Sequence, residues 1–223
     1  MSSGLVLFDL DGTLLTGDTD ALWCEFLMDE GVLDGAVFGA ANRAVVERYA
    51  RAEIGPAEYC AFYAATLAGR TQAAWQPLRE RFVAAVIAPR IAASARALVD
   101  AHRHAGDTLV LTTATNRFLT EPIAAGLGID ALIATELELV GGAFSGRNTG
   151  VLNMREGKPE RLRAWLDGRG KDANTLAGAT FYSDSINDLP LLCAVGKAVV
   201  VDPDERLRAE AAARGWPVLT LAR

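Results

Sequence analysis

Apolar and polar positions follow two different periods along the chain. A short apolar run at residues 5–8 is followed by a block, from about 18 to 87, in which apolar residues recur at helical spacing without a strand pattern. We expect four helices in this block, at 19–28, 34–50, 56–67 and 72–87. From residue 89 onward helical stretches alternate with apolar runs, which lie at 108–112, 132–134, 179–182, 198–201 and 217–220. Polar and apolar residues alternate about Gly141 and Gly142, which predicts a hairpin at 137–144.

This order of elements predicts an α/β fold: a Rossmann-like, doubly wound and mostly parallel sheet, with a small helical cap domain inserted after the first strand. Apolar strands that alternate with helices are typical of parallel sheets covered on both faces. We expect residues 1–15 and 89–223 to form the core and residues 16–88 to form the cap. Ligands of such sheets bind outside the carboxyl ends of the strands. Because the cap starts just after the carboxyl end of the first strand, it should lie over this ligand-binding edge of the sheet.

The composition adds little beyond an ordinary globular protein. Of the 223 residues, 51% are hydrophobic and 22% charged, and the formal net charge of -6 argues against a broad nucleic-acid surface. No stretch approaches the roughly 18 consecutive apolar residues of a membrane-spanning helix, and the N-terminus has no basic region of a secretory signal. We therefore expect a cytoplasmic protein that binds neither nucleic acid nor membrane. Nothing in the pattern indicates an oligomeric state.

Cysteines and histidines are few and poorly spaced for metal binding. We expect Cys24, Cys60 and Cys193 to be buried free thiols in a reducing compartment. His102 and His104 lie two apart near the end of an expected helix, so they point to different faces, and we expect them to be solvated.

Three of the expected strands end in polar side chains. Asp9 and Asp11 follow the first run, Thr113 and Thr115 follow a later one, and Asp184 follows another. If these strands are neighbours, the side chains converge at one edge of the sheet. Asp9 and Asp11 repel each other unless a cation or a proton lies between them, so the pair implies a divalent metal, a protonated acid or both. Alone, the pair also fits a turn with solvated carboxylates, or the metal motif of a nucleotide-sugar transferase.

Together with Lys158 and Asp188, these residues form a set suited to phosphoryl chemistry. Mg2+ prefers oxygen ligands and bridges one or two carboxylates to a phosphate. Thr113, nearby backbone N–H groups and Lys158 can bind the phosphate oxygens. The chain has no Walker-type loop with Gly-Lys-Ser/Thr, and an aspartate can act as nucleophile to form an aspartyl-phosphate.

The chain resembles the haloacid dehalogenase superfamily, and within it the phosphatase branch (subfamily IB) that contains phosphoserine phosphatase. Four motifs carry the resemblance, in order and at strand ends: Asp9-Leu10-Asp11-Gly12-Thr13, Thr113, Lys158 and Ser183-Asp184-Ser185-Ile186-Asn187-Asp188. The resemblance covers the whole chain. It implies a Mg2+-dependent phosphomonoesterase that acts on a small-molecule phosphate ester.

The resemblance also implies a role for each of these residues. Asp9 would attack phosphorus, and Asp11 would protonate the leaving alkoxide and then act as base for the hydrolytic water. The metal would be held by the side chains of Asp9 and Asp184 and by the backbone carbonyl of Asp11, with Asp188 supporting these ligands. Lys158 would offset the carboxylate charge. The phosphate would be contacted by Lys158, Thr113, Ala114 and Asn187.

Several of these residues could instead have a purely structural role. Lys158 could be a solvated residue at a helix start, although a cation is mildly unfavourable there beside the helix dipole. Asp188 could cap the next helix. Thr112 competes with Thr113 for the second motif, and we favour Thr113 because Ala114 then begins the small-residue turn of the family.

Asp18 is the residue that bears most directly on the substrate. In phosphatases of the phosphoserine type, an acidic residue seven positions after the second aspartate of the first motif contacts the substrate ammonium, and Asp18 occupies that position. Asp18 fits the N-cap of the following helix equally well. We expect an amine-bearing substrate, phosphoserine or histidinol phosphate. Phosphatases of this type also use a cap arginine for the substrate carboxylate, and the candidates are Arg43, Arg48, Arg51, Arg70, Arg79 and Arg81.

Other functions fit part of the pattern. A phosphotransferase or a broad-specificity phosphatase on the same fold would carry the same residues. Dehalogenases of the superfamily generally lack the second aspartate, which is present here as Asp11. A receiver-like signalling module would have neither the helical insertion nor a carboxylate pair after the lysine. A non-catalytic phosphate-binding relic should have lost at least one of the site residues, and none is missing.

Overall fold

The structure, a computed structural model, describes residues 4–172 and 174–222. In this part of the chain seven strands form one sheet in the order β4-β3-β2-β1-β5-β6-β7. β4 runs antiparallel to β3, and the other neighbours pair in parallel. The predicted α/β fold with a doubly wound, mostly parallel sheet is therefore confirmed. The strands span Leu5–Phe8 (β1), Thr108–Asn116 (β2), Ala131–Val140 (β3), Ala143–Thr149 (β4), Thr180–Ser183 (β5), Lys197–Val201 (β6) and Val218–Leu219 (β7).

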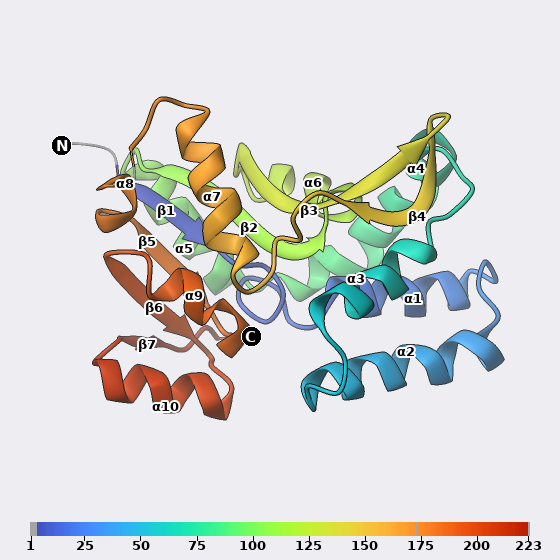
Figure 1. Ribbon diagram of the computed structural model, residues 1–223, viewed down its shortest axis with the longest axis horizontal. Coiled ribbons are helices and arrows are strands. Elements are labelled where there is room, and N and C mark those ends of the chain that lie inside the picture. The colour runs from blue at the N-terminus through green and yellow to red at the C-terminus, as the bar shows by residue number, and fades with distance from the viewer. Residues whose placement is uncertain (1–3, 173, 223) are drawn as a thin grey trace.

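Between β1 and β2 the chain is helical, as the sequence predicts. Figure 1 shows α1, α2 and α3 stacked on the side of the molecule where the β3–β4 hairpin lies. The helices span Thr19–Asp29 (α1), Gly35–Ala50 (α2), Pro56–Ala65 (α3) and Gln72–Phe82 (α4). A π-helical turn, Val83–Ile87 (η1), and a 3-10 turn, Ala88–Arg90 (η2), lead back to the sheet.

The fourth helix differs from its prediction, because the regular α-helix ends at Phe82 and not at Ile87. Both side chains are buried. Residues five apart lie on clearly different faces of an α-helix, whereas i→i+5 hydrogen bonding brings them onto nearly the same face. The π-helical turn thus keeps Phe82 and Ile87 in one apolar cluster.

The helices that follow cover both faces of the sheet. Alternate residues of β1 point to opposite faces: Val6 and Phe8 join one apolar cluster, and Leu5 and Leu7 join the other. The first cluster is completed by α5 (Ala93–His104) and α6 (Arg117–Gly126). The second is completed by α7 (Gly157–Asp167), α8 (Asn174–Ala177), α9 (Leu189–Leu192) and α10 (Glu205–Arg214). A short 3-10 turn, Ile186–Asp188 (η3), precedes α9.

α1 joins the helical segment to the rest of the protein. Its buried Trp23 packs against Phe82 and belongs to the same apolar cluster as β1, whereas its buried Cys24 packs with α2 and α3 in a separate cluster. That separate cluster also contains Val45 and Tyr63. The packing of α1 therefore fixes the direction from which α2 and α3 approach the carboxyl edge of the sheet.

β2 is longer than predicted. Thr113 pairs with Ala134, and after a register shift Asn116 pairs with Thr135, so the segment expected to be a polar turn continues as strand. Sequence polarity suggested a turn, but backbone pairing with β3 decides the conformation here. The predicted hairpin is confirmed: β3 and β4 are joined at Gly141 and Gly142, both with positive φ.

Two predictions about individual side chains are wrong. Cys193 is exposed, because the short helix α9 ends there, while Cys24 and Cys60 are buried as predicted. His102 is partly buried: its Nδ1 lies 2.8 Å from Oδ2 of Asp107, and its Nε2 lies 2.9 Å from the hydroxyl of Tyr182. The sequence did not show the contact with Tyr182, because Tyr182 comes from a distant strand.

Among the described residues, no helix taken singly has the length and hydropathy needed to span a membrane. One pair of helical segments, Gln72–Arg90 and Ala93–His104, reaches those criteria only when joined across a bend of 94°.

Candidate active site

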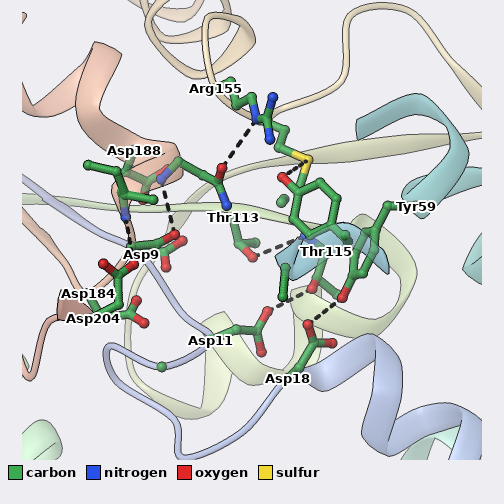
Figure 2. A pocket seen from close by; sticks show the side chains of 18 of the residues that line it. Asp9, Asp11, Asp18, Tyr59, Thr113, Thr115, Arg155, Asp184, Asp188 and Asp204 are labelled. Carbon is green, nitrogen blue, oxygen red and sulfur yellow. Dashed lines mark hydrogen bonds between the residues drawn. The ribbon is translucent and has the colours of Figure 1, made fainter. Parts of the chain in front are cut away.

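The polar residues that follow β1 and β5 and those near the end of β2, before Asn116, meet at one edge of the sheet. β1 lies between β2 and β5, and the N–H of Asp9 donates to the carbonyl of Tyr182 at 3.0 Å. These residues line a cavity of about 720 Å³, whose wall is completed by α2, α3 and the start of α10. Figure 2 shows two groups of side chains in this cavity, one containing Asp9, Asp184 and Asp188 and the other containing Asp11, Asp18 and Tyr59.

Lys158, in the first turn of α7, bridges two carboxylates. Its Nζ donates to Oδ1 of Asp9 and to Oδ2 of Asp188, both at 2.7 Å, and Ser183 Oγ donates to the same Oδ2 at 2.7 Å. Burial alone would lower the pKa of Lys158, but the charges of Asp188 and Asp9 hold this pKa above its usual range, so the ammonium stays charged. Lys158 is therefore not a solvated helix-start residue. Asp188 precedes α9 but makes no side-chain capping hydrogen bond to it.

Asp9, which is buried, and Asp184, which is partly buried, interact in the cavity. Burial raises the pKa of Asp9 to about 6 although Lys158 lies beside it, and burial followed by the charge of Asp9 raises the pKa of Asp184 to about 8. Thr13 holds Asp184, since its Oγ1 donates to Oδ1 of Asp184 at 2.8 Å and accepts from the N–H of Asp184 at 3.0 Å. Position 12, directly before Thr13, requires glycine. The φ of Gly12 is +77°, and a Cβ at this position would lie 2.1 Å from Oδ2 of Asp184.

Two threonines hold the carboxylate of Asp11, and the sequence did not reveal this role. Thr115 Oγ1 donates to Oδ2 of Asp11 at 2.7 Å, while the N–H of Thr19 donates to Oδ1 at 2.8 Å and the Thr19 hydroxyl donates to the same atom. Burial, and then the charge of Asp18, raises the pKa of Asp11 to about 7. A usable signal was present: Thr115 lies two residues after Thr113, and side chains two apart in a strand share a face.

Thr113, Ala114 and Thr115 line the cavity, whereas Thr112 does not, in the part of the chain that is described. Thr113 Oγ1 accepts from the N–H of Thr115 at 3.2 Å. Thr112 Oγ1 instead accepts from Nδ2 of Asn153 at 3.0 Å. The geometry therefore favours Thr113 over Thr112 as the residue available to a ligand.

Asp18 is an N-cap and a cavity residue at the same time. Its Oδ1 accepts from the N–H of Ala21 at 2.9 Å, which caps α1, and its Oδ2 accepts from the hydroxyl of Tyr59. Its side chain also lines the cavity. The N-cap interpretation is therefore confirmed and the side chain lies in the cavity, whereas contact with a substrate ammonium stays a prediction.

Asp20 is a cavity residue that the sequence did not single out. It is only 4% exposed, and its Oδ1 accepts from Nδ2 of Asn116 at 3.0 Å. Burial, and then the charges of Asp18 and Asp11, raise the pKa of Asp20 well above its usual range. Three carboxyl groups are thus crowded beside the first turn of α1.

Arg155 and Tyr49 bring the loop before α7 and helix α2 together at the cavity. Arg155 Nε donates to Oδ1 of Asn187 at 3.2 Å, and its guanidinium lies 5.5 Å from the centre of the Tyr49 ring. The Tyr49 hydroxyl donates to Sδ of Met154 at 3.5 Å. Arg155 has a φ of +50°, the left-handed conformation that glycine adopts most readily. No sequence pattern marks Arg155, because its position depends on how α2 packs.

The cap arginines considered as carboxylate ligands do not line the cavity formed by the described residues. Arg48 pairs with Glu58 and Arg81 with Glu30. Arg79 donates to the carbonyl of Phe118 at 2.8 Å. The cavity therefore takes no guanidinium from the helical segment.

The donor set fits a divalent cation. Asp9 is buried and the neighbouring Asp184 is partly buried, and the pKa of Asp184 is raised by burial and also by the charge of Asp9. The described residues contain no group of three or more His, Cys, Asp or Glu side chains arranged as a complete metal site. Mg2+ does not need one, because it binds one or two carboxylates and completes its shell with water and phosphate oxygens. Asp188 is paired with Lys158, which also contacts Asp9, so Asp188 lies next to the two carboxylates that would bind the metal.

Fold and site together define an α/β enzyme with an aspartate-centred site at the carboxyl edge of its sheet. The chain belongs to the family of haloacid dehalogenase-like hydrolases, whose model matches residues 6–192. The predicted superfamily and its phosphoserine phosphatase-like branch are confirmed, and so is the predicted enzyme class, a phosphatase.

The chain is similar to a histidinol-phosphatase of Neisseria meningitidis, with 37% identity over 96% of this chain and 97% of the relative. It is 38% identical to phosphoserine phosphatase SerB1 of Mycobacterium tuberculosis over 69% of this chain, but it spans only 49% of that relative's length. A Bordetella pertussis structure of unknown function matches with a TM-score of 0.93 and 40% identity, covering 98% and 99% of the two chains. A substrate-bound phosphoserine phosphatase, at 16% identity and a TM-score of 0.69 over 94% and 91%, shares the fold.

Proposed function

We propose that the protein is a Mg2+-dependent phosphomonoesterase that hydrolyses a small phosphorylated metabolite through an aspartyl-phosphate at Asp9. One observation carries this proposal: buried Lys158 holds Asp9 at 2.7 Å, while Asp11, two residues further on, is held by separate hydroxyl groups. A fixed carboxylate beside a cation suits a nucleophile, and a partly buried acid whose pKa is raised suits proton transfer.

The proposed reaction has two steps. In the first, a carboxylate oxygen of Asp9 forms a bond to phosphorus while the bond from phosphorus to the ester oxygen breaks, and Asp11 gives its proton to the leaving alkoxide. In the second, Asp11 takes a proton from water as that water attacks phosphorus, which releases inorganic phosphate and restores Asp9. Lys158 offsets the negative charge of the transferring group, and Thr113, Ala114 and Asn187 contact its oxygens.

Mg2+ would be held by the side chains of Asp9 and Asp184 and by the backbone carbonyl of Asp11, with Asp188 orienting Lys158 beside them. When bound, the ion supplies charge that neutralises the phosphate and the carboxylates around it. Residues 16–88 would serve as a cap over the site, since Tyr49 and Tyr59 from this segment line the cavity.

The proposed substrate carries an amine, and phosphoserine and histidinol phosphate are the two candidates. Asp18 supports this, because one carboxylate oxygen faces the Tyr59 hydroxyl in the cavity while the other caps α1. The similarity to the Neisseria histidinol-phosphatase over nearly its whole length adds support for an amine-bearing ester.

The test is phosphate release from a panel of esters, with Mg2+ and then with EDTA. The panel contains phosphoserine, histidinol phosphate, a sugar phosphate, a nucleotide and an aryl phosphate. We expect Mg2+-dependent hydrolysis with a preference for an amine-bearing ester. Phosphate that is transferred to an added alcohol in place of water would indicate a phosphotransferase, and equal rates across the panel would indicate a broad-specificity phosphatase. Absence of turnover on every ester would refute the proposal.

Removal of the metal should make the stability of the protein fall as pH rises. The pKa values of Asp9, Asp11 and Asp184 are raised to about 6, 7 and 8 from an ordinary value of 3.8, with burial as the largest cause. A carboxyl group whose folded pKa is raised contributes stability below its unfolded pKa and loses that contribution as pH rises through the folded pKa. We expect the Tm in EDTA to fall between about pH 4 and pH 8, and added Mg2+ to raise the Tm more at pH 8 than at pH 5.

Thermal unfolding at both pH values, in EDTA and in Mg2+, measures this. The variant Asp184→Asn should show a shallower fall in Tm with pH in EDTA and a smaller gain from Mg2+. A Mg2+ effect of the same size at pH 5 and pH 8 would contradict the prediction.

A further inference from the structure

The cavity has two chemically different ends. At one end Lys158 pairs with Asp9 and Asp188, and Arg155 donates to Asn187. The other end, which we call the acidic end, is formed by Asp11, Asp18, Asp20 and Tyr59. The ring of Tyr49 lies between the two ends, since its centre is 5.5 Å from the guanidinium of Arg155 and 4.5 Å from the centre of the Tyr59 ring. Asp11 and Asp18 lie together in Figure 2, apart from Asp9 and Asp188.

We propose that the leaving group of the substrate is a cationic amino alcohol without a carboxylate, and that Asp20 reads its charge together with Asp18. This inference rests on the phosphatase function proposed above and narrows its substrate class. Asp20 would be a specificity-determining residue. Of the two candidate esters, the proposal selects histidinol phosphate and excludes phosphoserine.

The charge balance of the acidic end favours a cation. Asp11 interacts with Asp18, and Asp20 interacts with both, so the three carboxyl groups share one small space. The hydrogen-bond donors that reach them there are neutral: threonine groups for Asp11, the Tyr59 hydroxyl for Asp18 and the amide of Asn116 for Asp20. An ionised carboxylate can accept about four hydrogen bonds, which leaves room for an ammonium group.

The same arrangement disfavours a substrate carboxylate. A substrate carboxylate at the acidic end would lie beside the carboxyl groups of Asp11, Asp18 and Asp20 with no cation to offset its charge, and unpaired charges are a strong means of rejecting a ligand. The aromatic ring of Tyr59 suits a cation or a ring, because the π-face of an aromatic ring is negative. The arginines of the helical segment do not line this cavity in the described chain, so they offer no compensation there.

Arg155 offers an alternative way to bind a substrate, in which the substrate does carry a carboxylate. Its guanidinium lines the cavity next to Tyr49 and could pair with a carboxylate that extends toward Asn187. The two arrangements predict opposite preferences for one matched pair of esters. O-phosphoserine and O-phosphoethanolamine differ only in the carboxylate, and both carry the amine.

The experiment measures kcat/KM with Mg2+ for these two esters, for histidinol phosphate and for an aryl phosphate. We expect phosphoethanolamine and histidinol phosphate to exceed phosphoserine by about ten-fold or more. Asp20→Asn, which keeps the shape of the side chain, should lower kcat/KM for both cationic esters by about ten-fold or more and leave the aryl phosphate nearly unchanged. Asp18→Asn should act in the same direction, because asparagine retains the N-cap of α1 while removing the charge.

Glu25→Gln is the matched control, since it removes one charge from an exposed position on the same helix. It should leave every substrate unchanged. A preference for phosphoserine that disappears in Arg155→Met would overturn the proposal and assign the carboxylate to Arg155. Equal kcat/KM values for the two matched esters would also overturn it. If none of the four esters is hydrolysed, the phosphatase function itself fails and the substrate inference fails with it.

Discussion

Replacing Asp9 by asparagine should lower kcat for phosphate release by about a thousand-fold or more, because an amide cannot form the phosphoryl-enzyme bond. The protein should remain folded, since an asparagine oxygen can still accept from Lys158, and Lys158 keeps Asp188 as its partner. The measurement is single-ester turnover at saturating Mg2+, combined with thermal unfolding of the same sample.

The matched control for Asp9→Asn is Asp130→Asn, which removes an exposed carboxylate at the opposite end of the sheet, just before β3. This control should turn over at the parent rate. In the parent enzyme, mass spectrometry after rapid acid quenching should find one added phosphoryl group on the peptide that contains Asp9. Residual activity of Asp9→Asn above about one per cent of the parent would exclude Asp9 as the nucleophile.

Replacing Lys158 by methionine should have the second largest effect, and it should reduce both activity and stability. The ammonium is buried between Asp9 and Asp188, so its loss leaves two buried carboxylates without their cation. Breaking a buried ion pair from one side typically lowers the free energy of unfolding by about 3–5 kcal/mol. Loss of a charged group that contacts the transferring phosphoryl should lower kcat by about a hundred-fold or more. Chemical denaturation of the metal-free protein and turnover with Mg2+ measure the two effects.

Lys197→Met is the control for Lys158→Met, because Lys197 is exposed at the start of β6. It should change neither quantity. The double variant Lys158→Met/Asp188→Asn should recover part of the lost stability, since it removes one of the unpaired charges, but it should not recover activity. A Lys158→Met protein with near-parental turnover would refute the role of Lys158 at the phosphoryl group.

Much of the fold could be predicted from periodicity. The helical segment between β1 and β2, the parallel strands and the hairpin at Gly141 all follow from local patterns of apolar residues and glycine. The predictions failed where pairing or packing overrides the local pattern. Residues 113–116 continue β2 because Thr113 and Asn116 pair with β3 on either side of a register shift, and a π-helical turn replaces the end of α4 because Phe82 and Ile87 are both buried.

The candidate site likewise contains some residues that the sequence predicts and some that it does not. Asp9, Asp11, Asp184 and Lys158 could be picked out because their residue types stand at strand ends or at a helix start, where short-range sequence order sets position. The division of the chain into a core and a cap at residues 16–88, and the chemical role of each site residue, stay predictions that the variants above test.

By itself the sequence determined which chemical groups gather at the edge of the sheet, because a parallel strand delivers the residues after it to that edge wherever its neighbours lie. Only the tertiary structure decided what each group contacts. Lys158 meets Asp9 across 149 positions, and Thr115 meets Asp11 across 104. Asp20 and Arg155 became cavity residues only because α1 and α2 pack over the strand ends. The sequence near each strand end sets which residue types are present at the site. Ion pairing and burial depend on distances between residues far apart in the sequence, and these distances are defined only in the folded protein.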